Sequence, residues 1–254
     1  FWRYEQIIAA GIRQRLAPVS SVTNGQGPAA RTLAKALSVL FPDPGNPDYQ
    51  KIACALAARH RFAVITGGPA VGEAFTKLKF DHLFYTGSTQ VGRLVAKAAA
   101  ENLVPVTLEL GGKSPAIVTP DYPQDAAAKS IAWGKLFNAG QTCVAPDYVL
   151  APKGSERDLG EAIINVAAHQ FPDASSDDAY TAIVSDRHYD RLNAMIEEAR
   201  QGGAEILQPE HDAQAAQAAR KIPPTVVLNP PADAAVMTEE IFGPVLPMVG
   251  YSEL

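Results

Sequence analysis

Short apolar runs alternate with amphipathic stretches along the chain between about residues 62 and 110. A short apolar run bounded by turn residues is typical of a buried strand, whereas apolar residues that recur every three or four positions indicate a helix. Strands alternating with helices of this length indicate βαβ units, so we expect an α/β fold in which helices cover both faces of parallel sheets. This stretch predicts strands at 62–65, 82–85 and 106–110 and helices at 71–77 and 91–102.

A second region with the same kind of pattern begins after Pro115. Its longest helix, at 185–201, begins at Ser185, a residue type that caps helix N-termini through its hydroxyl group. Residues 213–220 fit either a short helix or a loop. The other predicted elements are helices at 126–137 and 158–169 and strands at 147–150, 225–228 and 245–249.

The composition is that of a soluble globular protein, with 47% hydrophobic residues, 19% charged residues and a net charge of -5. No basic cluster suggests a nucleic-acid partner, and the apolar runs are far shorter than the roughly 20 residues of a membrane span. The first fifteen residues mix charges with apolar positions, unlike a signal peptide. We therefore expect a cytoplasmic protein with neither nucleic acid nor membrane as a partner.

The two cysteines have chemically different surroundings. Cys54 lies in an apolar helical stretch, which favours a packing role. Cys143 follows Gly140 among small and polar residues, which is typical of an accessible nucleophile. Neither cysteine has a second Cys or a His at zinc-ligand spacing, and the five histidines are scattered, so no metal site is expected.

Residues 86–89, which read T-G-S-T, lie where a predicted strand passes into a predicted helix. Gly87 and Ser88 at such a turn would allow backbone N–H groups to approach a phosphate at the helix N-terminus, with Gly92 close behind. The G-x-G-x-x-G dinucleotide motif is absent, however, and a glycine at a tight turn can equally serve backbone geometry.

Residues 108–115 read L-E-L-G-G-K-S-P and place the carboxylate of Glu109 in an apolar strand end. Such a carboxylate is a candidate for a raised pKa and for general-base catalysis. The alternative is a glutamate that faces solvent or pairs with Lys113.

These segments, together with N-A-G-Q-T-C at 138–143, resemble the aldehyde dehydrogenase superfamily, which carries T-G-S-T, E-L-G-G-K-S-P and N-x-G-Q-x-C in this order. A fourth match, E-E-I-F-G-P-V at 239–245, follows at the expected distance. The resemblance covers residues 62–251. The segment D-Y-V-L at 147–150 resembles the corresponding segment of the family branch that acts on fatty and aromatic aldehydes, which includes the coniferyl aldehyde dehydrogenases.

The resemblance implies NAD- or NADP-dependent oxidation of an aldehyde, aromatic or of medium to long chain, such as coniferaldehyde, to the carboxylic acid through a cysteine thiohemiacetal and thioester. Cys143 would be the nucleophile, with its backbone N–H as half of the oxyanion hole. Glu109 would activate the hydrolytic water and help to deprotonate the thiol. The resemblance places the following residues at the cofactor: Gly87 and Ser88 at the pyrophosphate, Gly92 and Leu110 nearby, Gly111 at the nicotinamide, and Glu240 at its ribose with Phe242 beside it.

Three family segments have no counterpart in the sequence. They are P-W-N, whose Asn completes the oxyanion hole, K-P-[SA]-E, which contacts the adenosine ribose, and the C-terminal P-F-G-G-x-x-x-S-G, near the strand used for homo-oligomer assembly. Loss of one oxyanion donor costs about 10²–10³ in rate. We therefore expect a partial copy of the family fold: an unassigned segment at 1–61, a partial Rossmann-like dinucleotide-binding region at 62–115 and an incomplete catalytic domain at 116–254.

Three functions remain open at this point. The first is an aldehyde oxidoreductase, which requires NAD(P) together with Cys143. The second is a binding or subunit-interaction module without redox activity. The third is a cofactor-free thiol esterase or acyl transferase that uses Cys143 and Glu109. The resemblance favours the first.

Overall fold

The computed structural model describes residues 67–253, in two compact units that divide between Glu109 and Leu110. The helices predicted at 6–16 and 29–40 and the strand predicted at 62–65 lie outside the described residues.

In the described part of the first unit, two strands pair with each other and a helix connects them. Apolar side chains of this unit, among them Leu83, Val95 and Val104, form a small buried cluster. The connecting helix begins earlier than predicted because the hydroxyl of Ser88 caps it, accepting a hydrogen bond from the Val91 N–H at 3.3 Å. The elements are α4 (Pro69–Thr76), β1 (Leu83–Gly87), α5 (Thr89–Glu101) and β2 (Val106–Leu110).

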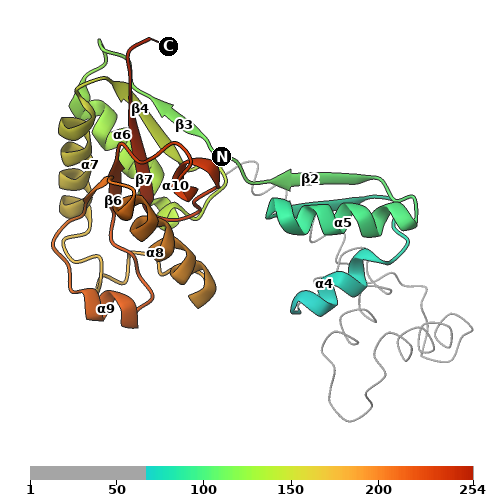
Figure 1. Cartoon of the computed structure of the whole chain (residues 1–254). Coiled ribbons are helices and arrows are strands. Elements are labelled where there is room, and N and C mark those ends of the chain that lie inside the picture. Colours follow the sequence, from blue (N-terminus) through green and yellow to red (C-terminus); the bar gives the residue numbers. More distant parts are fainter. Residues whose placement is uncertain (1–66, 254) are drawn as a thin grey trace, which may run out of the picture. The chain divides into compact units, whose positions relative to one another are not determined.

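The second unit contains a five-stranded sheet and most of the helices that the structure describes (Figure 1). Its sequence positions agree closely with the periodicity described above, and the strand predicted at 225–228 is confirmed residue for residue. The elements are β3 (Pro115–Ile117), α6 (Gln124–Leu136), the 3-10 turn η1 (Phe137–Gly140), β4 (Tyr148–Pro152), α7 (Glu156–Gln170), α8 (Asp186–Gln201), β5 (Glu205–Leu207), α9 (Ala213–Ala218), β6 (Thr225–Leu228), α10 (Ala235–Thr238) and β7 (Val245–Tyr251).

The strand order of this sheet is β3-β4-β7-β6-β5. The first four strands are parallel, as the βαβ pattern predicts, with Val149 opposite Met248 in the β4–β7 pair. The fifth strand, β5, departs from this parallel pattern, since it pairs antiparallel to β6. β5 is a three-residue strand at the edge of the sheet, and its one neighbour is β6. An antiparallel pair does not require the helical crossover that connects two parallel strands.

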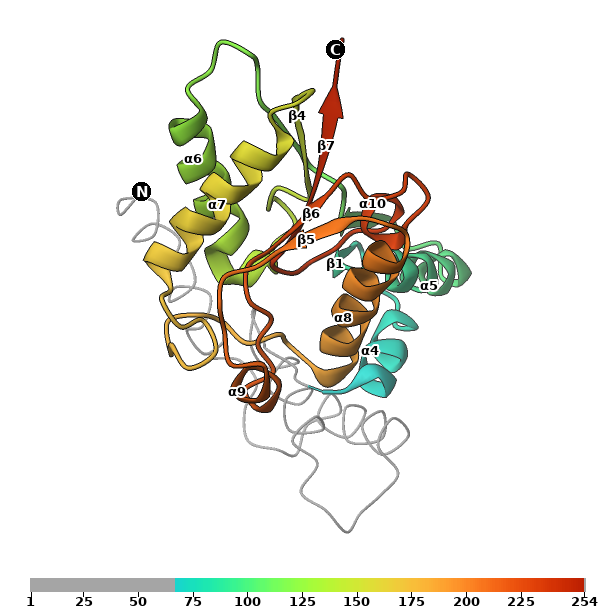
Figure 2. The same ribbon diagram turned by 60° about the vertical axis from the view of Figure 1, so that its left-hand side comes forward.

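Helices cover both faces of this sheet (Figure 2). On one face, Val226 and Leu228 of β6 pack in a cluster with side chains of α6 and α7. On the other face, Val227 packs in a second cluster with side chains of α8. Successive strand side chains point to opposite faces, so a strand covered on both sides must be apolar throughout, and all four residues of β6 are buried.

The shortest elements were not predicted. β3, β5, α10 and η1 span three or four residues each, too few for a period of 2 or 3.6 to become visible. The open choice at 213–220 resolves as the helix α9, whose N-terminus is capped by the carboxylate of Asp212. The predicted cap at Ser185 is confirmed, since its side chain accepts a hydrogen bond from the N–H of His188.

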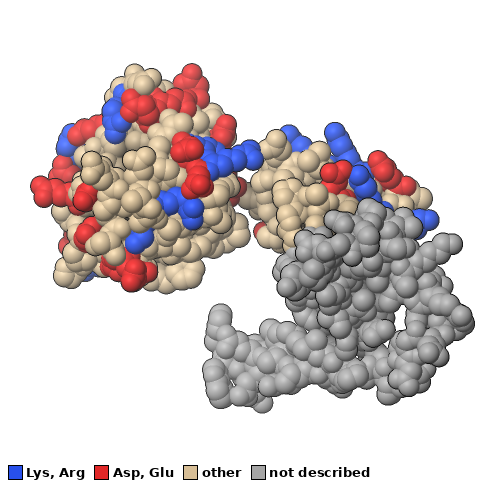
Figure 3. All heavy atoms as spheres, turned by 90° about the horizontal axis from the view of Figure 1, so that it is seen from below, with Lys and Arg blue, Asp and Glu red and all other residues tan. Residues whose placement is uncertain are grey.

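The surface carries mixed charge. On the face seen in Figure 3, basic and acidic side chains of the described residues are interspersed. Within residues 67–253, no helix combines the length and the apolar character that a membrane span requires.

Candidate functional site

The loop that carries Cys143 begins with an abrupt reversal of the chain at the end of α6. Asn138, Ala139 and Gly140 all have positive φ, at 52°, 51° and 71°, a conformation that residues other than glycine adopt rarely. A Cβ atom at Gly140 would lie 2.3 Å from the carbonyl oxygen of Gly243, so only glycine permits this contact. Backbone of this kind persists where its surroundings hold it in place, and it is common at functional sites.

The side chain of Gln141 fixes this loop to a neighbouring segment. Its Oε1 accepts a hydrogen bond from the N–H of Val184 at 2.9 Å, and its Nε2 donates to the carbonyl of Ala182 at 3.1 Å. Nε2 also donates to the carbonyl of Asn138, whose own amide donates to the carbonyl of Gln141. The reversal is therefore tied both to itself and to residues 182–184.

Cys143 lies at the exposed centre of this loop as a free thiol. Gln141 before it and Ala145 after it are both buried. An exposed thiol between two buried anchors can meet a substrate while its backbone stays in place. Cys54, predicted to be a packing residue, lies outside the described residues.

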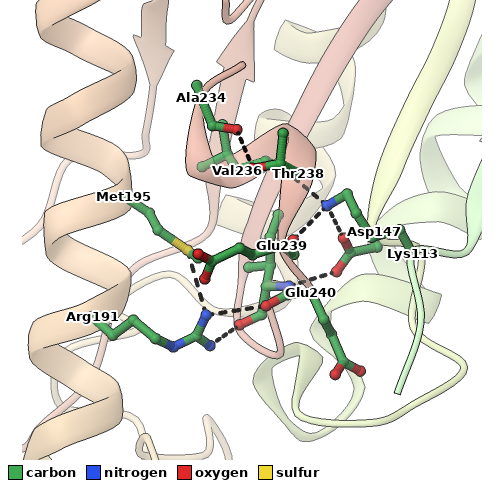
Figure 4. Close-up of polar contacts among 10 residues, drawn as sticks. Lys113, Asp147, Arg191, Met195, Ala234, Val236, Thr238, Glu239 and Glu240 are labelled. Carbon is green, nitrogen blue, oxygen red and sulfur yellow. Dashed lines mark hydrogen bonds and ion pairs between the residues drawn. The ribbon is translucent and has the colours of Figure 1, made fainter. Parts of the chain in front are cut away.

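Asp147, directly before β4, joins two further motifs to the loop of Cys143 (Figure 4). Its Oδ1 accepts a hydrogen bond from the N–H of Ile241 at 3.0 Å, and its Oδ2 forms an ion pair with Lys113. The Nζ of Lys113 also donates to the carbonyls of Val236 at 2.9 Å and Glu239 at 2.7 Å. These three contacts use all three donors of the ammonium group.

Arg191 of α8 holds the same segment from the other side. Its guanidinium donates to the carbonyl of Glu240 at 3.0 Å and to that of Ile241. Partial burial lowers the pKa of Arg191 from its ordinary value, with Glu239 and Glu240 acting in the opposite direction. A guanidinium titrates so far above neutral pH that the side chain stays charged.

The side chain of Glu240 lies against Gly111. A Cβ atom at Gly111 would lie 1.8 Å from Oε2 of Glu240, so the absence of a side chain there makes room for the carboxylate. Among the described residues, the hydrogen bond made to Glu240 by a side chain goes to its main-chain carbonyl, and its carboxylate points away from the Nζ of Lys113 without a hydrogen-bond partner (Figure 4). Phe242 follows at a φ of 53°. The structure thus brings Gly111 and Glu240 together within the second unit, with Leu110 and Phe242 close to them in the chain.

The other predicted site residues belong to the first unit. Gly87 ends β1, and Ser88 caps α5, where its hydroxyl is occupied by the N–H of Val91. Gly92 is buried in α5, and its N–H donates to the carbonyl of Ser88 at 2.9 Å, so this amide is not free to bind a phosphate. Glu109 lies on β2 as an exposed residue.

Lys135 on α6 is a residue that the sequence analysis did not single out. Its side chain is buried, with 2% exposed, and its Nζ has no hydrogen-bond partner among the described residues. Burial lowers its pKa from 10.5 to about 8; Asp147 and Glu240 oppose this shift, and the charge of Lys113 adds to it. The amine therefore lies within the electrostatic field of the groups just described.

We expect the substitution Lys135→Met to stabilise the second unit at neutral pH. Below pH 8 the lysine is charged in both the folded and the unfolded chain, and the folded chain bears the cost of burying that charge. The difference between a pKa of about 8 and one of 10.5 corresponds to about 3 kcal/mol. As the pH rises through 8 toward 10.5, the folded chain loses its proton first, so the wild type gains stability and the advantage of the methionine disappears.

Urea denaturation at pH 7 and at pH 10 measures this difference. Lys129→Met, which changes an exposed lysine on the same helix, is the matched control and is expected to have little effect at either pH. An equal gain at both values of pH would show that the effect of Lys135→Met comes from packing and not from a buried charge.

The sequence did not identify four of these residues as functional: Lys113, Asp147, Gln141 and Arg191. Three of them, Lys113, Gln141 and Asp147, lie inside motifs quoted above. Among residues 67–253, no group of three or more His, Cys, Asp or Glu side chains is arranged to hold a metal ion.

The chain is similar to known proteins over most of its length. The sequence pattern of the Aldehyde dehydrogenase family matches residues 57–254. Two curated relatives called probable coniferyl aldehyde dehydrogenase, from Caulobacter vibrioides and Pseudomonas aeruginosa, are 47% and 49% identical over 82% and 90% of this chain. A dimeric NADP-preferring aldehyde dehydrogenase from Mus musculus is 42% identical over 85% of it.

Solved structures share the fold as well. An aldehyde dehydrogenase from Mycobacterium tuberculosis, in complex with NAD+, matches 79% of this chain with a TM-score of 0.69 and 30% identity. This chain covers 43% of that structure, and 44%, 48% and 44% of the three curated relatives. It therefore spans less than half the length of the relatives that it matches.

Proposed function

Because the chain belongs to the aldehyde dehydrogenase family, we propose that it contributes the nucleophile-bearing part of an enzyme that oxidises an aldehyde to the carboxylic acid with NAD or NADP. The observation that carries this proposal is the exposed thiol of Cys143 on a loop that is anchored on both sides. A fixed backbone with a free thiol is what covalent catalysis requires.

In the proposed reaction, the thiolate of Cys143 attacks the aldehyde carbonyl and forms a thiohemiacetal. The N–H of Cys143 donates a hydrogen bond to the oxygen that becomes negative, because an amide aimed at a developing charge stabilises the transition state. The nicotinamide, when bound, accepts the hydride that leaves the thiohemiacetal carbon. The product on the protein is a thioester of Cys143.

Hydrolysis of the thioester is assigned to Glu109. Its carboxylate takes a proton from water, the resulting hydroxide attacks the thioester carbon, and the bond between that carbon and the sulfur breaks. The carboxylic acid leaves, the sulfur of Cys143 departs as the thiolate with which the reaction began, and Glu109 releases its proton to solvent. An exposed carboxylate, as Glu109 is within its own unit, has the access to water that this step requires.

The residues around Glu240 fit a cofactor that carries hydroxyl groups. A carboxylate is an acceptor with two oxygens, and that of Glu240 has no donor among the described residues. We assign it to the ribose next to the nicotinamide, with Gly111 and Phe242 beside it. Gly87, Ser88 and the N-terminal turn of α5 are assigned to the pyrophosphate, through amides such as those of Thr89 and Gln90.

An aromatic aldehyde is the proposed substrate class. The probable coniferyl aldehyde dehydrogenases are 47% and 49% identical to this chain, and their name specifies an aromatic aldehyde. The similarity extends through the loop of Cys143, where the substrate must bind. Coniferaldehyde is therefore the first substrate to test.

The test is formation of NADH or NADPH by the purified chain with coniferaldehyde, followed by nicotinamide absorbance. Turnover with either cofactor is the expected result. Release of product from an ester without any cofactor, and no nicotinamide signal, would replace the proposal with a thiol esterase. A folded chain that does neither would be a binding or subunit-interaction module.

A further inference from the structure

Two cations and one carboxylate are used to hold a short stretch of main chain. We call Lys113, Asp147 and Arg191 the clamp, and residues 236–241 the clamped segment. The clamp makes two hydrogen bonds from Lys113, one to Asp147 and two from Arg191, all to carbonyl or N–H groups of the clamped segment. Because the three members come from separate parts of the second unit, the clamped segment is fixed from several directions (Figure 4).

This arrangement carries a desolvation penalty that a purely structural contact between apolar side chains would avoid. The side chains of Lys113 and Asp147 are only 19% and 5% exposed, so both charges have lost most of their water. Burial of an ion pair contributes little to stability when apolar packing is the alternative. Charged groups do form strong, directional hydrogen bonds, and each of these fixes the position of a particular main-chain atom.

The clamp fixes the main-chain carbonyls directly before and after the side chain of Glu240. Lys113 binds the carbonyl of the residue before it, and Arg191 binds its own carbonyl and that of Ile241. With the main chain held in this way, the Glu240 carboxylate lies against Gly111, where no Cβ atom obstructs it. The clamp leaves that carboxylate itself unpaired.

We propose that Arg191, together with Lys113 and Asp147, positions Glu240 for the ribose of the nicotinamide cofactor, and so sets the affinity for NAD(P) without contributing to the reactivity of Cys143. The proposal rests on the assignment of Glu240 to the cofactor made above. Arg191 is a positioning residue, because its guanidinium contacts main-chain carbonyls and leaves the carboxylate free.

The variant Arg191→Met tests the clamp, because it keeps much of the apolar contact of the side chain and removes both hydrogen bonds. We expect the Kd for NADH or NADPH, measured by fluorescence titration of the full chain, to rise about tenfold, the size expected for loss of hydrogen bonds to a charged group. Arg191→Lys keeps a charged donor but lacks the planar guanidinium that reaches both carbonyls, so it should recover part of the lost affinity. Gly111→Ala, which displaces the carboxylate directly, should weaken binding in the same direction.

Two further measurements separate positioning from general loosening. Hydrogen exchange should rise in the peptide that contains residues 236–242. The rate at which iodoacetamide alkylates Cys143, followed by mass spectrometry of its peptide, should stay within about twofold of the wild type, because Gln141 anchors the loop of Cys143 separately, to residues 182–184. Arg200→Met, which changes an exposed arginine on the opposite face of the same helix, is the matched control and should change none of the three readouts.

Distinct results would overturn the two parts of the proposal. An unchanged Kd in Arg191→Met, or a Kd and an alkylation rate that change together, would show that the clamp has no separate role in cofactor binding. Unchanged exchange at residues 236–242 would show that Arg191 does not hold the clamped segment. If the wild-type chain binds neither NADH nor NADPH, the proposed function fails, and the positioning role fails with it whatever the exchange result shows.

Discussion

Replacement of Cys143 by alanine is expected to reduce NAD(P)H formation from coniferaldehyde by at least about 10³-fold, the scale of effect seen when a catalytic nucleophile is removed. Without the thiol there is no thiohemiacetal, and a free aldehyde offers no comparable hydride donor. The fold should be unaffected, because Cys143 is exposed and its loop is held through Gln141 and Gly140. Steady-state rates of the wild type and the variant give the comparison.

The other cysteine of the chain supplies the control. Cys54→Ala removes the same chemical group from an apolar stretch, so turnover should persist as long as the variant folds. Cys143→Ala should still bind NADH or NADPH with the affinity of the wild type, since Glu240 and Gly111 are untouched. Residual turnover by Cys143→Ala within tenfold of the wild type would exclude a covalent mechanism on this residue.

The long elements of the second unit could be predicted because their periodicity extends over many residues. The sixteen residues of α8 show an apolar face through Leu192, Met195, Ile196 and Ala199, and a Ser cap marks its start. β6 is apolar throughout because both of its faces are covered. β3 and β5 have no such signal, because three residues are too few to show an alternation of apolar and polar positions. The antiparallel direction of β5 is a property of its position at the edge of the sheet, which its own residues do not reveal.

The motifs could be found in the sequence, but the reasons for their glycines could not. Gly111 makes room for the carboxylate of Glu240, and Gly140 lets the chain approach Gly243. Each reason involves a partner more than a hundred residues away in the sequence. The resemblance to the aldehyde dehydrogenase family, which the comparisons confirm, located these positions without explaining them.

The clamp was missed for a related reason. Its acceptors are mainly main-chain carbonyls, which are the same for every residue type, so the sequence of residues 236–241 has no feature that identifies them as targets of Lys113 and Arg191. Lys135 was missed because a single lysine near the end of an amphipathic helix is usually at the surface. Only the packing around α6 shows that its amine is buried.

Replacement of Glu109 by glutamine should separate the two halves of the proposed reaction. An amide cannot accept the proton of the attacking water, so hydrolysis of the thioester should slow by about 10²-fold or more, the usual contribution of a general base. The oxidation step precedes hydrolysis and should still produce one equivalent of NAD(P)H for each thiol. Rapid mixing with coniferaldehyde should therefore show a burst of NAD(P)H followed by a slow steady state.

Glu101→Gln is the matched control, because it changes another exposed glutamate of the first unit, at the end of α5. Its steady-state rate should equal that of the wild type. If Glu109→Gln also turns over at the wild-type rate, the base lies elsewhere and the exposed position of Glu109 on β2 has the surface role that its sequence context also allowed. If the burst itself is lost, Glu109 acts earlier, in removing the proton of the Cys143 thiol, because the adduct must form before any hydride can leave.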